Sequence, residues 1–326
     1  MRAFLARRWF LIALTTGVAV ALRWPTPILA ATGSLPPYLV IAIAVFITSW
    51  TMPTRSLGDE IRSPTAAIWS LVISYLFLPI LGYCLGVFSP NPDFRVGLLL
   101  SASVPCTLAS SVLWTRMAEG NEATALCSVL GSTMISWFAT TAWLTATTGT
   151  NVELDAARMM LDLVFALILP VALGQAFRLP TACREFADRR RGWLTAFGQT
   201  FILAMVLKTS AQVGRKVMDG STNVTWADIA ISGSLAMSLH VAALYFGFWT
   251  SRWLGFDVAR QRAIAFCGSQ KTLPVSILLF EKYFEEAFPL AIIAVLFFHV
   301  GQLLLDTLIA ERMKRTTSVM EMTKKS

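Results

Sequence analysis

The chain has 326 residues, of which 56% are hydrophobic and only 14% are charged, and its mean hydropathy is +0.63. Because a soluble domain carries about 25% charged residues, this composition excludes an ordinary soluble protein and indicates helices that cross a lipid bilayer. The formal net charge of +8 fits basic residues held on one side of a membrane, so we expect no nucleic-acid partner.

Ten apolar segments separated by short charged stretches predict an all-α, polytopic membrane protein with ten transmembrane helices. The first two segments are short, so their ends are the least exact. In chain order, the predicted spans are residues 9–22, 38–50, 66–87, 96–114, 123–145, 159–176, 194–213, 229–249, 263–280 and 289–308.

The distribution of basic residues predicts how these spans are oriented. With residue 1 in the cytoplasm, most of the 27 Lys and Arg residues fall in cytoplasmic segments. We therefore expect both termini in the cytoplasm and, in a bacterium, insertion in the inner membrane.

Two five-helix repeats of opposite orientation are predicted, because five is an odd number of membrane crossings. Residues 106–113 read CTLASSVL and residues 271–278 read KTLPVSIL, with Thr, Leu, Ser and Leu at matching positions of the fourth and ninth spans. We divide the chain into residues 1–176, with the first repeat and the sixth helix; a basic cytoplasmic loop, 177–193; the seventh to tenth helices, 194–308; and a basic cytoplasmic tail, 309–326.

The fourth and ninth spans contain helix-breaking residues in mid-membrane. Pro105 lacks an N–H in the fourth span, and the ninth has Gly268 and Pro274 on either side of Gln270 and Lys271. A Lys at the centre of a plain transmembrane helix costs about 2.5 kcal/mol or more. We therefore predict two interrupted helices that line a cavity, as in many secondary transporters.

Polar side chains beside these interruptions form the candidate site for substrate or ions, since the ends of half-helices carry partial charges. The candidates are Thr107, Ser110, Ser111, Gln270, Lys271, Thr272 and Ser276.

Two short segments carry a family resemblance: residues 120–123 read GNEA and residues 265–271 read AFCGSQK. With the span count and the two interruptions, they resemble the bile acid:sodium symporter superfamily, in its SBF-like, sodium/bile acid cotransporter 7-like branch. The resemblance covers essentially the whole chain. It implies a panel domain of spans 1, 2, 6 and 7 and a core domain of spans 3–5 and 8–10, in which spans four and nine cross near the bilayer midplane.

The resemblance also implies where sodium-coupled members hold their ion, and this chain departs from them. Their ninth-span Glu and Asn correspond to Phe266 and Lys271, so the sodium-ligating carboxylate is missing, whereas their Gln is kept as Gln270. The implied counterparts of their remaining ligands are Ser74 of the third span, Ser110 and Ser111 of the fourth, and Ser128, Ser132 and Ser136 of the fifth. Ser132 is therefore added to the candidate site.

Three roles for Lys271 stay open at this point: its ammonium substitutes for sodium, carries a proton, or pairs with an anionic substrate. His240 and His299, together with Lys271, are candidates for a proton relay, because imidazole titrates near neutral pH. The alternative for each histidine is a hydrogen-bonded structural role.

Three other charged residues are expected near the ends of spans, where long side chains reach water. Asp162 and Asp306 are expected at the membrane interface, and Lys208 is expected to extend its ammonium to the nearer surface. The cysteines lack metal-ligand spacing, and we expect neither a metal site nor a cofactor.

These patterns predict a secondary transporter that moves an organic, anionic solute across the bilayer by alternating access, without strict coupling to sodium; a proton or sodium is the coupling ion. The alternative is a non-transporting membrane regulator that keeps the fold, since the coupling carboxylate is missing. An enzyme is not expected, because no span has paired carboxylates, H-E-x-x-H or G-x-S-x-G. A His–Asp pair facing Ser110 or Ser111 would revive that class.

Overall fold

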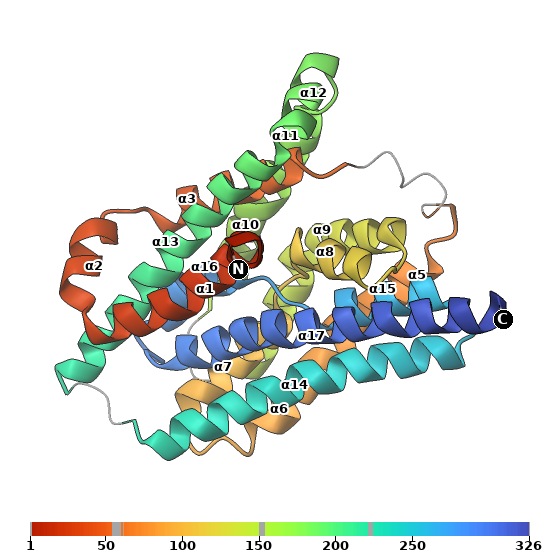
Figure 1. Cartoon of the computed structure of the whole chain (residues 1–326). Coiled ribbons are helices and arrows are strands. Elements are labelled where there is room, and N and C mark those ends of the chain that lie inside the picture. The colour runs from red at the N-terminus through yellow and green to blue at the C-terminus, as the bar shows by residue number, and fades with distance from the viewer. Residues whose placement is uncertain (1, 54–59, 61, 150–153, 221–223, 326) are drawn as a thin grey trace.

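The computed structural model describes residues 2–53, 60, 62–149, 154–220 and 224–325, and the secondary structure of this described part is entirely helical (Figure 1). Its first half contains α1 (Arg2–Arg23), α2 (Pro25–Thr32), α3 (Pro37–Trp50), α5 (Thr65–Val72), the π-helix η2 (Ile73–Phe77), α6 (Leu78–Gly86), α7 (Pro92–Ser103), α8 (Ser110–Met117) and α9 (Glu122–Thr148). Its second half contains α10 (Ala156–Leu163), the π-helix η3 (Val164–Ile168), α11 (Leu169–Ala176), α12 (Thr181–Arg189), α13 (Arg191–Met218), α14 (Trp226–Trp253), α15 (Val258–Ser269), α16 (Leu273–Leu279), the π-helix η4 (Phe280–Phe284) and α17 (Ala291–Lys325).

Seven helices of the described part are long and apolar enough to cross a membrane, or eight if the bent pair α1–α2 is one span. The predicted first span lies within α1, and just beyond it Pro25 begins α2, which is bent by 112° from α1. The helix α3 and the pair α7 and α8 are individually short, so the total of ten spans stays a prediction. The length and hydropathy of the other helices establish a multi-pass membrane protein.

The helices form two groups that lie side by side (Figure 1). In one group, α13 packs against α1, α2 and α3. In the other, α14 packs against α15 and α17, and α17 packs against α7. The short helix α16 contacts α3 and α13 of the first group and α7 and α17 of the second. The second interrupted helix therefore lies where the two groups meet.

A proline and a π-turn interrupt the regular hydrogen bonding of the third predicted span. Pro79 follows η2 and offers no N–H to the carbonyl of Tyr75, four residues earlier. That carbonyl instead accepts a hydrogen bond of 2.6 Å from the indole of Trp143 on α9. A buried carbonyl needs such a partner, and this one ties η2 to the neighbouring helix.

Close helix packing makes Gly97 of α7 sensitive to substitution. A Cβ atom at Gly97 would lie 2.1 Å from the carbonyl oxygen of Ala291 and 2.8 Å from the Cβ of Ala294, both at the start of α17. We expect Gly97→Ala to separate α7 from α17 and to lower the free energy of unfolding by roughly 1–3 kcal/mol. Unfolding in detergent followed by circular dichroism measures this change.

Gly192 is the matched control, because a Cβ at this α13 position would meet nothing within 4 Å. Gly192→Ala is expected to leave stability unchanged or to raise it by up to about 1 kcal/mol, since Ala favours the helix. Equal stability changes in the two variants would contradict the close approach of α7 and α17.

Two charged residues expected near the membrane surface have partners within the protein, and one of them, Lys208, is buried. Lys208 of α13 is only 8% exposed; its ammonium donates to the carbonyl of Leu35 and lies 3.5 Å from the carboxylate of Glu281. Asp162 accepts from the hydroxyl of Tyr283 at 2.5 Å and pairs with Lys282 at 2.7 Å. The expectation for Lys208 was wrong, because a buried acid of η4 offsets its charge.

Candidate functional site

Two helix interruptions meet inside the bundle. The first lies between Ser103, where α7 ends, and Ser110, where α8 begins; the second lies between Ser269 of α15 and Leu273 of α16. The backbone N–H of Thr272 in the second interruption donates to the carbonyl of Pro105 in the first, at 3.0 Å. The two interrupted backbones are therefore in direct contact.

The residues that the sequence marked as helix breakers lie at or beside these interruptions. Pro105 is within the first. Gly268 is in the last turn of α15, where an added Cβ would lie 2.9 Å from the side chain of Ile73. Pro274 occupies the first turn of α16, where its missing N–H is tolerated. Gly268 thus contributes close packing against η2, while the prolines end regular hydrogen bonding.

The ammonium group of Lys271 is buried between the interruptions, and the residue is only 2% exposed. Its three hydrogens have three acceptors: the carbonyl of Ser74 at 2.6 Å, the hydroxyl of Ser74 at 2.9 Å and the carbonyl of Val104 at 2.8 Å. The nitrogen also lies 4.8 Å from the centre of the Tyr75 ring, over its face. A buried charge with this many partners is held firmly in one place.

The local backbone explains why these carbonyls are available. In η2 the N–H of Leu78 donates to Ile73, one residue beyond the α-helical partner, and the following residue, Pro79, has no N–H. The Ser74 carbonyl is thus left without those two backbone donors. Val104 follows the last residue of α7, where helix carbonyls lack partners and carry partial negative charge. The result is a site for a cation, and the chain's own ammonium fills it.

The side-chain amide of Gln302 on α17 binds both the N–H and the carbonyl of Lys271 in the second interruption. Its oxygen accepts from the N–H of Lys271 at 3.0 Å, and its nitrogen donates to the carbonyl of Lys271 at 2.8 Å. The same nitrogen lies 2.8 Å from Nδ1 of His299. Sequence reasoning missed Gln302, although an amide in the apolar tenth span was a visible signal.

The first interruption contributes a cluster of hydroxyl groups around Gln270. The hydroxyls of Thr107, Ser110 and Ser111 lie 2.8, 3.0 and 3.0 Å from Oε1 of Gln270. These candidates are therefore brought together. Ser132 is set apart from them, because its hydroxyl accepts from the N–H of Cys106 and stabilises the interrupted backbone.

A buried His–Asp contact lies on the other side of Gln270. Nε2 of Gln270 donates to Oδ2 of Asp306 at 2.5 Å, and Oδ1 of Asp306 lies 2.9 Å from Nε2 of His240 on α14. The expectation that Asp306 lies at the membrane interface was wrong, because the residue is fully buried. Hydropathy ends the tenth span near this residue, but α17 continues well beyond it.

This His–Asp pair does not form a catalytic triad with the serines of the first interruption. In a triad, one imidazole nitrogen faces the carboxylate and the other faces the nucleophile. Here Nδ1 of His240 faces the carbonyl of Ser269 at 3.3 Å, and Gln270 lies between Asp306 and the hydroxyl cluster. The His240–Asp306 pair is therefore not placed to act as a base for Ser110 or Ser111.

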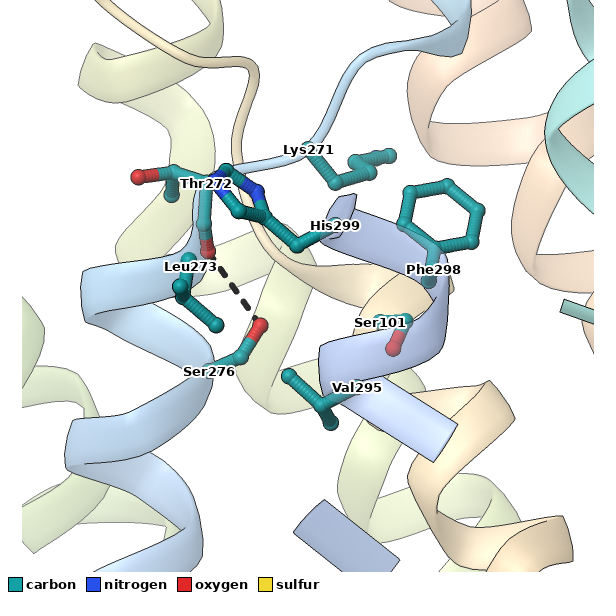
Figure 2. Close-up of a pocket in the computed structure, with 8 residues that line it drawn as sticks. All are labelled: Ser101, Lys271, Thr272, Leu273, Ser276, Val295, Phe298 and His299. Carbon is teal, nitrogen blue, oxygen red and sulfur yellow. Dashed lines mark hydrogen bonds between the residues drawn. The ribbon is translucent and has the colours of Figure 1, made fainter. Parts of the chain in front are cut away.

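A small pocket adjoins the second interruption (Figure 2). Thr272, Ser276 and His299 line it with Ser101, and the Ser276 hydroxyl donates to the carbonyl of Thr272 at 3.2 Å. Lys271 also borders this pocket, while its ammonium is directed to Ser74 and Val104. In this conformation the pocket has no room even for a water molecule, whereas small-molecule sites usually have roughly 300 Å³ or more. The pocket has to widen before an organic molecule enters.

Comparison with known proteins gives a match along almost the whole chain. Residues 8–315 match the SBF-like CPA transporter family (DUF4137). The rice protein "Probable sodium/metabolite cotransporter BASS4, chloroplastic" (Oryza sativa subsp. japonica) is 29% identical over 93% of this chain and 75% of its own length. "Sodium/bile acid cotransporter 7" of Danio rerio is 24% identical over 94% of each chain.

Proposed function

We propose that this chain, which belongs to the SBF-like CPA transporter family, is a secondary transporter that moves an organic anion by alternating access without requiring sodium. Its apolar helices make it an integral multi-pass membrane protein. The relatives named above are called cotransporters, which supports a transport function. The substrate class and the coupling are our inferences from the site.

The observation that carries the proposal is the ammonium of Lys271 in a site built from protein oxygens. The hydroxyl and the carbonyl of Ser74 and the carbonyl of Val104 are already used by Lys271. A sodium ion about 4 Å from this charge would be repelled by about 4 kcal/mol at an effective dielectric constant near 20. The names of the two relatives mention sodium, but Lys271 supports a different coupling here.

The charge of the site supports an anionic substrate. Lys271 borders a pocket whose hydroxyl and imidazole groups come from Thr272, Ser276 and His299, and its ammonium, bound to Ser74 and Val104, is the charged group of the site. Gln302 donates to Nδ1 of His299, so a neutral His299 carries its hydrogen on Nε2 and can donate from there. Hydrogen-bond donors beside a fixed cation are suited to a carboxylate or sulfonate group.

Alternating access is supported by the position of the pocket and its size. The group around α13 and the group around α14 and α17 are the candidates for panel and core, with inverted repeats and cytoplasmic termini as predicted from the sequence. Because α16 contacts both groups, sliding one group past the other would widen the pocket that α16 borders. A substrate then reaches the interruptions from one membrane face at a time.

The test is a stabilisation screen of the purified protein with organic anions, in sodium chloride and in choline chloride, followed by uptake in proteoliposomes. A bound anion at 100 times its Kd raises stability by about 2.7 kcal/mol, and we expect the same rise in both salts. Uptake that occurs only in sodium would contradict the proposed coupling. Binding without uptake would favour a non-transporting regulator with the same fold.

A further inference from the structure

We propose that Asp306 and His240 form a proton-binding site whose occupancy controls the geometry of the two helix interruptions, so that the coupling ion is a proton. The coupling half of this proposal rests on the proposed transport function; the proton site itself does not. Both side chains are fully buried, and the hydrogen bonds of Lys271 to Ser74 and Val104 do not involve either of them.

The partners of the pair determine how many hydrogens it holds. The carbonyl of Ser269 only accepts, so Nδ1 of His240 carries a hydrogen. The amide nitrogen of Gln270 only donates, so Oδ2 of Asp306 accepts. Oδ1 of Asp306 and Nε2 of His240 then need one more hydrogen between them. All three contacts form only when the pair holds one proton more than a carboxylate and a neutral imidazole hold together.

Loss of that proton breaks one of the contacts. A neutral imidazole has a single N–H, which serves either Asp306 or the Ser269 carbonyl but not both. The remaining nitrogen then presents a lone pair to an oxygen, and a buried unsatisfied contact of this kind is costly. Ser269 ends α15 and Gln270 begins the interruption, so this cost acts directly on the second interruption.

Gln270 transmits the change to the first interruption. Its nitrogen is bound to Asp306, and its oxygen is bound to the hydroxyls of Thr107, Ser110 and Ser111. An amide is rigid and planar, so a movement of Asp306 also moves the oxygen that these hydroxyls share. Both interrupted helices thus respond to one proton.

The charges of the site give the coupling its direction. With its extra proton the Asp306–His240 pair is neutral overall, and Lys271 leaves the site with one positive charge. Without the proton the pair carries one negative charge, which balances Lys271. An organic anion is therefore favoured when the pair is protonated and is released more easily after deprotonation. This arrangement moves a proton and an anion in the same direction.

Several other titratable groups on the helices packed against α14 and α17 have partners away from this pair. In the described part of the chain these include Lys271 with Ser74 and Val104, His299 with Gln302, Cys267 with Ala125, Arg262 with Ala118 and Met313, Arg116 with Glu122, Asp93 with the N–H of Leu290, Arg95 with the Tyr83 ring, Arg23 with the Trp24 ring, Lys208 with Glu281, and Lys282 with Asp162. These pairs do not include Asp306 or His240, so their charges do not take up the hydrogen-bonding groups of the proposed proton site.

The test uses NMR on the full chain in lipid nanodiscs, without substrate, between pH 5 and pH 9. The chain has only two histidines, so ring-labelled histidine gives two sets of signals, and His299→Gln identifies those of His240. Labelled aspartate carboxyl groups and labelled threonine methyl groups report on Asp306 and Thr107. The variants Asp306→Asn and Thr107→Ser identify the two signals, because each variant removes one of them. We expect His240, Asp306 and Thr107 to change with one common midpoint in the wild type.

In Asp306→Asn we expect the His240 signals to lose their wild-type response to pH and the Thr107 response to disappear. Constant His240 and Asp306 signals across the pH range would overturn the proton site. A titrating pair with an unresponsive Thr107 would overturn the control of the interruptions. If Asp306→Asn fails to fold, the wild-type signals still test both the proton site and its control of the interruptions. A failure to transport any anion would contradict the proposed function but would not change these signals.

Discussion

Lys271→Met is expected to abolish transport and to lower the free energy of unfolding by roughly 1–3 kcal/mol, the cost of leaving buried hydrogen-bond acceptors unsatisfied. Methionine has a similar length but donates no hydrogen bond. The carbonyls of Ser74 and Val104 and the Ser74 hydroxyl would lose the ammonium that they surround. Unfolding in detergent and uptake in proteoliposomes at matched protein amounts measure the two effects.

Lys216→Met is the matched control for stability. Lys216 pairs with Glu285 at 3.5 Å, but its side chain is 33% exposed, and a pair of this kind contributes about 0–1 kcal/mol. A further variant, Lys271→Ala, tests the cation site directly, because it leaves the oxygens and makes space. We expect sodium to stabilise Lys271→Ala and not the wild type. Sodium stabilisation of the wild type, or an indifferent Lys271→Met, would show that the ammonium does not take the place of a cation.

The positions of both helix interruptions were predictable from sequence, because prolines and polar residues in mid-membrane are incompatible with a regular helix. Pro105 and the segment from Gly268 to Pro274 identified them within a few residues. The hydroxyl cluster followed from the same reasoning, since Thr107, Ser110 and Ser111 flank an interruption that had to face something polar. At these positions the types of the neighbouring residues were sufficient to predict the interruptions and the hydroxyl cluster.

The partners of Lys271 were beyond sequence reasoning, because they are mainly backbone carbonyls. The Ser74 carbonyl is available only through the π-helical register of η2, which tertiary packing determines. The turn of 112° between α1 and α2, just beyond the first predicted span, was also not predicted, because a hydropathy pattern shows where a helix is apolar but not where the chain bends. Such features depend on contacts between distant segments.

Asp306 shows how a hydropathy boundary misplaces a functional residue. The apolar segment ends near residue 308, and a carboxylate close to that end is normally at the interface. In the structure α17 runs on to Lys325, and Asp306 faces His240 of α14 inside the bundle. The packing of α14 against α17 distinguishes an acid at the interface from a buried one, and a hydropathy pattern does not show which helices pack together.

Gln302→Leu is expected to disable the transporter by releasing the second interruption. Leucine has a similar volume but offers no partner to the N–H and the carbonyl of Lys271, which the Gln302 amide now binds at 3.0 and 2.8 Å. Each buried backbone group left unsatisfied costs about 1–3 kcal/mol, so the free energy of unfolding should fall by roughly 2–6 kcal/mol. Denaturation in detergent and uptake in proteoliposomes measure stability and transport.

The control for this variant is Gln212→Leu on α13, since Oε1 of Gln212 is buried without a hydrogen-bond partner in the described part of the chain. Replacing this amide removes a desolvated group, so we expect stability to stay the same or to rise. The difference between the two variants isolates what the amide does at Lys271 from the general effect of leucine in a membrane helix. If Gln302→Leu were as stable and active as Gln212→Leu, the backbone at Lys271 would not depend on its contact with α17. The contacts that connect α17 to the first interruption would then be those of Asp306 with Gln270 and of Gln270 with the hydroxyl cluster.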